Sequence, residues 1–314
     1  MARVVCIGVG TVGCGWATVF ARAGHEVVLY DADPAMIASR ALPRIDATLE
    51  QLAHEMPTGE TTETIRARIQ VADTLAEAVA GAEVIQESVR EDLDIKRALF
   101  AEIGASAPAD CRLFSSTSAL PGSQFLSDIP NPGRAMVGHP VNPPSHIPLV
   151  ELCATPLTTP ETVEYAHAFY DKAGMEPITV EKEIDGFILN RLQYTLVAEA
   201  MHLVGEGYCS AADIDRVMTS GLALRWASIG PFMTAHLNAH EGFVGFVAQL
   251  EGMMKKMGAD ARTDYDWGPD LVSRIHDEMA RIRPVEDIAA AQAWRDRRIL
   301  ATRRLQAGET PTDA

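Results

Sequence analysis

The sequence of 314 residues has little positive charge, few cysteines and no long apolar run. It has 27 lysines and arginines but 43 aspartates and glutamates, and the resulting net charge of −16 argues against nucleic-acid or anionic-membrane partners. The five cysteines lack the paired spacing of zinc sites or disulfide frameworks, so we expect reduced thiols and a cytoplasmic location. No stretch is apolar for the ~20 residues of a membrane span, and a strand-like run starting at Arg3 leaves no room for a leader.

The first thirty residues predict a strand, a helix and a second strand. Residues 3–8 and 26–31 are short apolar runs of the kind found in strands buried on both faces, and residues 11–23 between them read as a helix. A long polar helical excursion near residues 34–70 follows, with breaks expected at Pro43 and at residues 57–59. A parallel sheet is the consequence of the first unit.

The remaining pattern divides near Ile184. Before it we expect strands at 82–86, 112–115, 134–139, 149–153 and 177–180, with helices at 93–103 and 162–173. After it the strand signal stops, and helices are expected at 187–207, 211–220, 235–256, 270–283 and 285–305. The predicted fold class is α/β: a doubly wound Rossmann-type sheet domain over residues 1–184, followed by an all-α C-terminal domain over residues 185–314.

A glycine-rich motif joins the first predicted strand to the first predicted helix, and it reads Gly8-Val9-Gly10-Thr11-Val12-Gly13. In a dinucleotide site the glycines permit a tight turn, a close approach of pyrophosphate and close packing of helix on strand. Asp31 ends the second predicted strand, near the offset of about 20 residues expected for the acid that binds the adenosine ribose. We therefore expect NAD rather than NADP, because the 2′-phosphate of NADP would meet Asp31 and Asp33.

Oxidising an alcohol by hydride transfer needs a base for the hydroxyl proton, and histidine is the usual one. His139 ends a predicted strand in a proline-rich turn, and Glu151 lies in the next apolar strand. A carboxylate there needs a partner, and a histidine paired with it has a fixed tautomer and raised basicity. The alternative is a structural histidine and a solvated edge glutamate.

Four segments in order resemble the 3-hydroxyacyl-CoA dehydrogenase family. They are residues 115–120 (SSTSAL), 138–143 (GHPVNP), 149–151 (LVE) and 186–192 (GFILNRL). Residues 139–151, 182–194, 230–232 and 236–238 further resemble the L-gulonate 3-dehydrogenase and lambda-crystallin branch, with similarity extending to residues 294–296. The resemblance implies that His139 is the general base, that Glu151 orients it, and that Ser118 and Asn190 bind the substrate oxygen.

The resemblance also assigns residues to the cofactor. The nicotinamide-ribose side would be lined by Glu91, Lys96 and Ser118, in addition to the glycine motif and Asp31. For Glu91 and Lys96, a solvated helix start is the alternative.

Two departures bear on the substrate. Acyl-CoA members usually carry asparagine where Ser116 stands. The stretch from Asp31 to Leu93 contains no lysine, although arginines at 40, 44, 66 and 68 remain, so a multi-phosphate tail would find limited positive charge. We therefore expect NAD-dependent oxidation of the 3-hydroxyl of a small hydroxy acid such as L-gulonate. The alternatives are L-carnitine, a 3-hydroxyacyl-CoA such as 3-hydroxybutyryl-CoA, and a non-enzymatic, crystallin-like role.

The helical domain predicts two further features. Arg225 lies in an apolar stretch, and its guanidinium could clasp a substrate carboxylate, the alternative being a structural ion pair. The apolar helices also predict a homodimer. His236 and His240 are four residues apart but lack a third ligand in the pattern of a zinc site, so we expect no metal.

Overall fold

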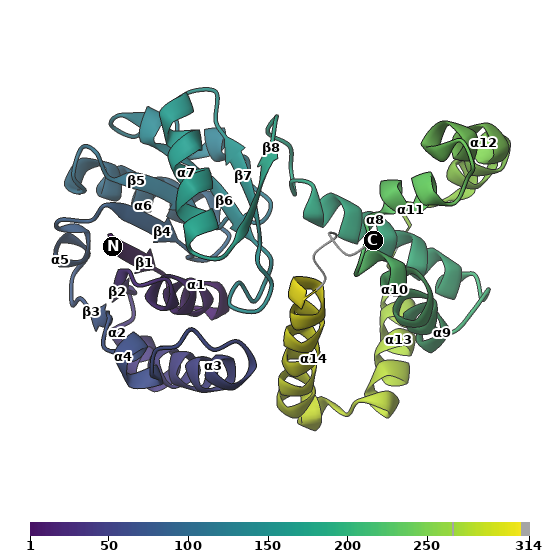
Figure 1. The fold of residues 1–314 in the computed structure, drawn as a ribbon, viewed down its shortest axis with the longest axis horizontal. Coiled ribbons are helices and arrows are strands. Elements are labelled where there is room, and N and C mark those ends of the chain that lie inside the picture. Colours follow the sequence, from purple (N-terminus) through teal and green to yellow (C-terminus); the bar gives the residue numbers. More distant parts are fainter. Residues whose placement is uncertain (266, 309–314) are drawn as a thin grey trace. The chain divides into compact units, whose positions relative to one another are not determined.

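A computed structural model describes residues 1–265 and 267–308 (Figure 1). The chain forms two compact units, Met1–Arg191 (unit 1) and Leu192–Ala314 (unit 2). Unit 1 is built around a mostly parallel sheet with helices, and unit 2 is helical. The predicted fold class is thereby confirmed.

The sheet of unit 1 has eight strands in the order β3-β2-β1-β4-β5-β6-β7-β8. All neighbours are parallel except β6 and β7. The strands are β1 (Arg3–Ile7), β2 (Glu26–Tyr30), β3 (Ile69–Val71), β4 (Val84–Glu87), β5 (Arg112–Ser115), β6 (Ala135–Pro140), β7 (Leu149–Ala154) and β8 (Glu176–Val180). The strand order reverses between β1 and β4, which makes the carboxyl ends of these two strands the expected binding crevice.

Helices cover both faces of the sheet because β1 presents alternate side chains to opposite faces. Val4 and Cys6 pack in one core with the helices at residues 11–22 and 160–172, and Val5 and Ile7 pack in another with those at 75–79 and 93–106. The helices of unit 1 are α1 (Thr11–Arg22), α2 (Pro34–Met36), α3 (Leu42–Glu55), α4 (Thr62–Arg66), α5 (Leu75–Val79), α6 (Leu93–Ser106) and α7 (Pro160–Lys172). Both faces of the central strands are therefore buried, as their continuous apolar runs predict.

Unit 2 is helical, and few of its described apolar residues are buried. Its helices are most of α8 (Leu189–Gly205), then α9 (Ala211–Val217), α10 (Ala223–Trp226), α11 (Pro231–Leu237), α12 (Gly242–Asp260), α13 (Pro269–Ile282) and α14 (Ile288–Gly308). Its described buried apolar residues are Ala198, Val204, Ala211, Ala235 and Leu300. Many large apolar side chains of the same helices are exposed, among them Leu192, Trp226, Phe232, Val244 and Met257.

The structure corrects three sequence expectations. Pro43 does not break the excursion, because it lies in the first turn of α3, where a missing N–H costs nothing, after a π-helical turn at Ile37–Ala41. The short strand β3 and helix α5 were not expected. The helix expected at 235–256 is two helices, because Gly242 has a φ of 65°, which a right-handed helix does not allow. The His236 ring accepts a hydrogen bond from the Phe243 amide (3.1 Å) across this turn between α11 and α12.

The glycine motif tests how β1 and α1 pack. A Cβ at Gly13 would lie 1.8 Å from the carbonyl oxygen of Gly8, whereas one at Gly10 would meet nothing within 4 Å. We expect Gly13→Ala to lower the free energy of unfolding in urea by at least ~3 kcal/mol, because backbone must move to make room. Gly10→Ala is the matched control and should cost less than ~1 kcal/mol. Equal stabilities of the two variants would contradict this account of the packing.

Candidate functional site

The glycine loop lies at the carboxyl end of β1, where one of its amides, that of Val9, binds Asp31. The Asp31 carboxylate accepts hydrogen bonds from Val9 N (2.9 Å) and Asp33 N (2.9 Å). Gly10, the N-cap of α1, has open space where a side chain would stand. Residues Gly8, Gly10, Thr11, Val12, Gly13 and Asp31 thus fit a dinucleotide: an open approach for pyrophosphate at a helix N-terminus, and an acid beside it.

Arg44 is a residue near this loop that sequence reasoning did not assign to it. Its Nη1 donates to Thr11 Oγ1 (2.9 Å), which places a guanidinium from α3 beside the first residue of α1. The charge lies next to the expected position of the pyrophosphate. No local pattern could have indicated it, because the contact joins residues 33 apart in the sequence.

His139 and Glu151 are directly opposite each other in the antiparallel register of β6 and β7. His139 Nδ1 lies 2.8 Å from Glu151 Oε2, and both residues are buried, at 4% and 0% exposure. A carboxylate can only accept, so Nδ1 carries the proton and Nε2 presents its lone pair. This arrangement is that of a general base with an orienting carboxylate.

The second oxygen of Glu151 is bound by the chain that leads into α8. Glu151 Oε1 accepts from Ile188 N and Leu189 N, each at 2.9 Å, at the positive end of the helix. Phe187, just before them, is fully buried with a φ of 50°, and its ring centroid lies 5.3 Å from that of His139. The helix N-terminus and the ring hold the pair in place.

Ser118 and Asn190 are brought together. Asn190 Nδ2 donates to the carbonyl oxygen of Ser118 (2.7 Å), and Asn190 directly follows the residues that bind Glu151. Both side chains are half-buried. His139, Glu151, Asn190 and Ser118 therefore form one connected group at the edge of the sheet where β5 and β6 end.

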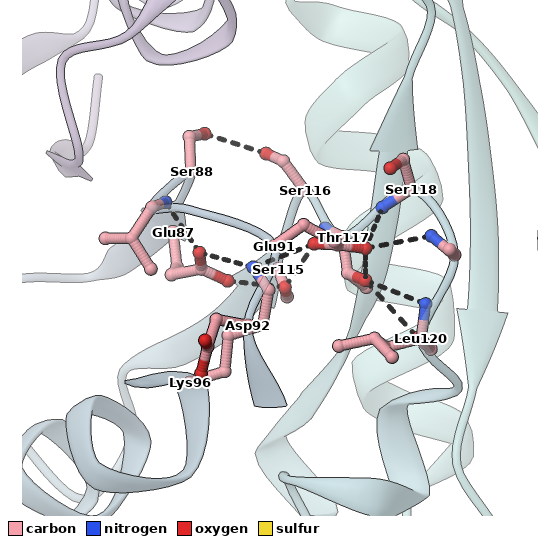
Figure 2. Close-up of polar contacts among 12 residues, drawn as sticks. Glu87, Ser88, Glu91, Asp92, Lys96, Ser115, Ser116, Thr117, Ser118 and Leu120 are labelled. Atoms are coloured by element: carbon pink, nitrogen blue, oxygen red, sulfur yellow. Dashed lines mark hydrogen bonds and ion pairs between the residues drawn. The ribbon is translucent and has the colours of Figure 1, made fainter. Parts of the chain in front are cut away.

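Glu91 binds the backbone of the loop that carries Ser118, and Lys96 lies beside Glu91 (Figure 2). Glu91 Oε1 accepts from Thr117 Oγ1 (2.6 Å), Ser118 N (2.9 Å) and Ala119 N (2.9 Å). Burial raises the pKa of Glu91, but these hydrogen bonds and the charge of Lys96 outweigh it and lower the pKa below its usual value. Lys96 is 1% exposed, so the expected alternative of a solvated helix start is wrong for this residue.

Ser116, where acyl-CoA members usually carry asparagine, is a hydrogen-bonding hub. Its hydroxyl bonds with Trp16 Nε1 (3.0 Å), Gln86 Nε2 (2.7 Å) and Ser88 Oγ (2.9 Å). Figure 2 shows the bond to Ser88, at the end of β4. The hydroxyl at this position binds protein groups from α1, β4 and the loop after β4.

Arg225 belongs to the other compact unit. It is an exposed residue of α10, and its carbonyl accepts from Ser228 N (3.0 Å) and Ile229 N (2.8 Å). Its flanking residues Leu224 and Trp226 are exposed as well.

Comparisons with known proteins identify the family. The model of the 3-hydroxyacyl-CoA dehydrogenase NAD-binding domain matches residues 3–184, and that of the C-terminal domain of the same family matches residues 186–275. The chain belongs to the 3-hydroxyacyl-CoA dehydrogenase family. It is accordingly an oxidoreductase that uses NAD, which agrees with the fit of the glycine loop and Asp31 to a dinucleotide.

Relatives cover most of the chain. Lambda-crystallin from Oryctolagus cuniculus is 39% identical over 93% of this chain and 92% of its own length. An L-carnitine dehydrogenase from Nocardiopsis dassonvillei is 37% identical over 96% of this chain and 90% of its own length. The crystal structure of an NAD⁺-dependent 5-formyl-3-hydroxy-2-methylpyridine 4-carboxylic acid 5-dehydrogenase has a TM-score of 0.84 and 28% identity, covering 99% of this chain and all of that one. The resemblance to the lambda-crystallin branch is confirmed.

The residues that the structure describes include no helix both long and apolar enough to span a bilayer.

Proposed function

We propose that this enzyme oxidises the 3-hydroxyl of a small free hydroxy acid such as L-gulonate. The observation that carries the chemistry is the buried cross-strand pair of His139 and Glu151, with Ser118 and Asn190 attached to it through residues 188–190. The free-acid class is supported by L-carnitine dehydrogenases among the relatives and by Ser116 in place of the usual asparagine. The L-gulonate substrate is supported by the sequence resemblance alone.

Each residue of the site has a separate proposed role in the reaction. Bound NAD supplies a nicotinamide that accepts the hydride. His139 takes the hydroxyl proton at Nε2, and Glu151 stabilises the imidazolium that results, while its other oxygen stays bound to two amides. The Ser118 hydroxyl and the Asn190 amide donate to the substrate oxygen as it becomes a carbonyl.

The cofactor would be held by the glycine loop and by Asp31, whose negative charge disfavours a 2′-phosphate. Glu91 and Ser118 would lie on the nicotinamide-ribose side. Lys96, which the resemblance also assigns there, is buried and would act through Glu91.

Arg225 is proposed to hold the substrate carboxylate. A guanidinium offers two parallel donors to a carboxylate, which fixes orientation as well as charge. The exposed position of Arg225 on α10 leaves its head group available for such a contact.

A second candidate substrate is L-carnitine, favoured by the 37% identity to an L-carnitine dehydrogenase over 96% of this chain. L-Carnitine shares the 3-hydroxyl and the carboxylate, so the roles of His139 and Arg225 would be the same. A CoA ester lacks the free carboxylate.

A homodimer is proposed on the surface of unit 2. Its helices expose large apolar side chains such as Leu192, Phe232 and Val244 (67%, 76% and 75%), while its described core is small. Exposed apolar area on this scale is typical of a surface that another chain covers. The occupant we propose is a second copy, which pairs the same helices about a twofold axis.

The first test is NADH formation with L-gulonate, L-carnitine, L-3-hydroxybutyrate and 3-hydroxybutyryl-CoA. We expect turnover of a free acid, reduced at least ~100-fold in His139→Ala because the base is lost. His54→Ala, an exposed histidine of α3, is the control and should retain full activity. Turnover of the CoA ester alone would overturn the free-acid proposal, and full activity of His139→Ala would remove His139 from the mechanism.

The second test concerns Arg225. Arg225→Lys keeps the charge but loses the paired donors, so the KM for the free acid should rise about tenfold with little change in kcat. Arg216→Lys, an exposed arginine of α9, serves as control. An unchanged KM in Arg225→Lys would eliminate the carboxylate contact.

The third test is the mass of the protein in solution. Size-exclusion chromatography with light scattering should give twice the 34.0 kDa of the chain. Phe232→Asp places a charge on the exposed apolar surface of α11, and we expect it to shift the population toward monomer. A monomer at all concentrations of the wild-type protein would contradict the homodimer.

A further inference from the structure

The loop that carries Ser118 is held mainly by one carboxylate. After β5 ends at Ser115, the amides of Ser118 and Ala119 both point at Glu91 Oε1, and the hydroxyl of Thr117 donates to the same oxygen. Figure 2 shows these three donors converging on Glu91. Successive amides that converge on one anion form a short, charge-assisted set of hydrogen bonds, which fixes backbone more firmly than neutral contacts do.

The Glu91 carboxylate is itself held by Lys96. Asp92 caps α6 by accepting hydrogen bonds from the amides of Asp94 and Ile95. Lys96 follows near the start of this helix, and its side chain is buried. Lys96 Nζ lies 3.4 Å from Glu91 Oε2 and 2.7 Å from Glu87 Oε1. One buried ammonium therefore pairs with two carboxylates, which lie at opposite ends of the loop that joins β4 to α6.

Glu87 extends the same arrangement to the cofactor side. It accepts from Val89 N (2.7 Å) and from Ser115 Oγ (2.5 Å), and it is completely buried. The backbone of Ser88 and Val89 lies against Gly8, where a Cβ would come within 2.6 Å of Ser88 O. The three charged residues thus connect the glycine loop, the end of β5 and the Ser118 loop.

We propose that Glu91 is a positioning residue that sets the Ser118 hydroxyl by binding the backbone of its loop, with Lys96 as the shared buried counter-charge. The opposite side of Ser118 is fixed by Asn190 Nδ2 on its carbonyl oxygen, so both backbone polar groups of Ser118 are bound. An effect of Glu91 on kcat rests on the proposed role of Ser118 at the substrate oxygen. An effect of Glu91 on the mobility of the loop does not depend on that role.

Variants at Glu91 leave no buried charge without a partner, because Lys96 keeps its 2.7 Å contact with Glu87. Glu91→Ala removes the acceptor, and Glu91→Gln keeps a neutral one. Glu102→Gln, at an exposed acid of α6, the helix that follows Glu91, is the control.

The first measurement is amide hydrogen exchange of the NAD-bound protein, followed in the segment 116–120. We expect exchange at Ser118 and Ala119 to be about tenfold faster in Glu91→Ala, with Glu91→Gln intermediate and Glu102→Gln unchanged. The strand β6 should exchange at the wild-type rate in all three variants. Unchanged exchange of the loop in Glu91→Ala would overturn the proposal whether or not the enzyme is active on any substrate.

The second measurement is a double-mutant cycle with Ser118→Ala on the substrate that the panel identifies. At saturating NAD, Glu91→Ala should lower kcat about tenfold or more, and it should lower kcat little further once Ser118→Ala is present. Additive losses in kcat would mean that Glu91 acts by direct contact with ligand. If Ser118→Ala itself has wild-type kcat, the proposed role of Ser118 in the reaction fails, and loop exchange still decides whether Glu91 holds the loop.

Discussion

The carboxylate of Glu151 is the constraint on which the rest of the site depends. A fully buried carboxylate costs several kcal/mol unless its lone pairs are satisfied, and here one oxygen binds His139 while the other binds two amides at the start of α8. Meeting that requirement joins β6 to β7 and fixes where α8 begins. Asn190 follows in the next position, so the same requirement places its amide at Ser118.

The sequence predicts those parts of the molecule that depend on local patterns. Seven of the strands follow from apolar runs, and the glycine loop is recognisable from its spacing directly after a strand; at Gly8 and Gly13 a side chain would meet backbone, within 2.6 Å and 1.8 Å. His139 and Glu151 could be paired because an acid in an apolar strand requires a partner. The short strand β3 has three residues and a polar centre, which is too little for a periodic signal.

What the sequence could not supply are contacts between side chain and distant backbone. Glu91 reads as an ordinary acid before a helix, yet its oxygen binds amides 27 and 28 residues away. Lys96 looks like a solvated lysine, yet its stem is buried and its charge lies between two acids. Arg44 reaches Thr11 from a separate helix. Tertiary packing decides whether a charged side chain is buried, and no periodic pattern in a single sequence predicts it.

The antiparallel pairing of β6 and β7 explains why His139 and Glu151 can pair where they do. His139 lies near the carboxyl end of β6. If β7 ran parallel to β6, the residue beside His139 would lie near the carboxyl end of β7, at Cys153 or Ala154. Because β7 runs the other way, the residue opposite His139 is Glu151, only 12 positions later and close to the strand's beginning. The chain from Val141 to Pro148 therefore returns directly without a crossover helix. His139 and Glu151 therefore lie together at the edge of the sheet where β6 ends and β7 begins. With a crossover connection, β7 would run parallel to β6, and only residues at its carboxyl end would reach that edge.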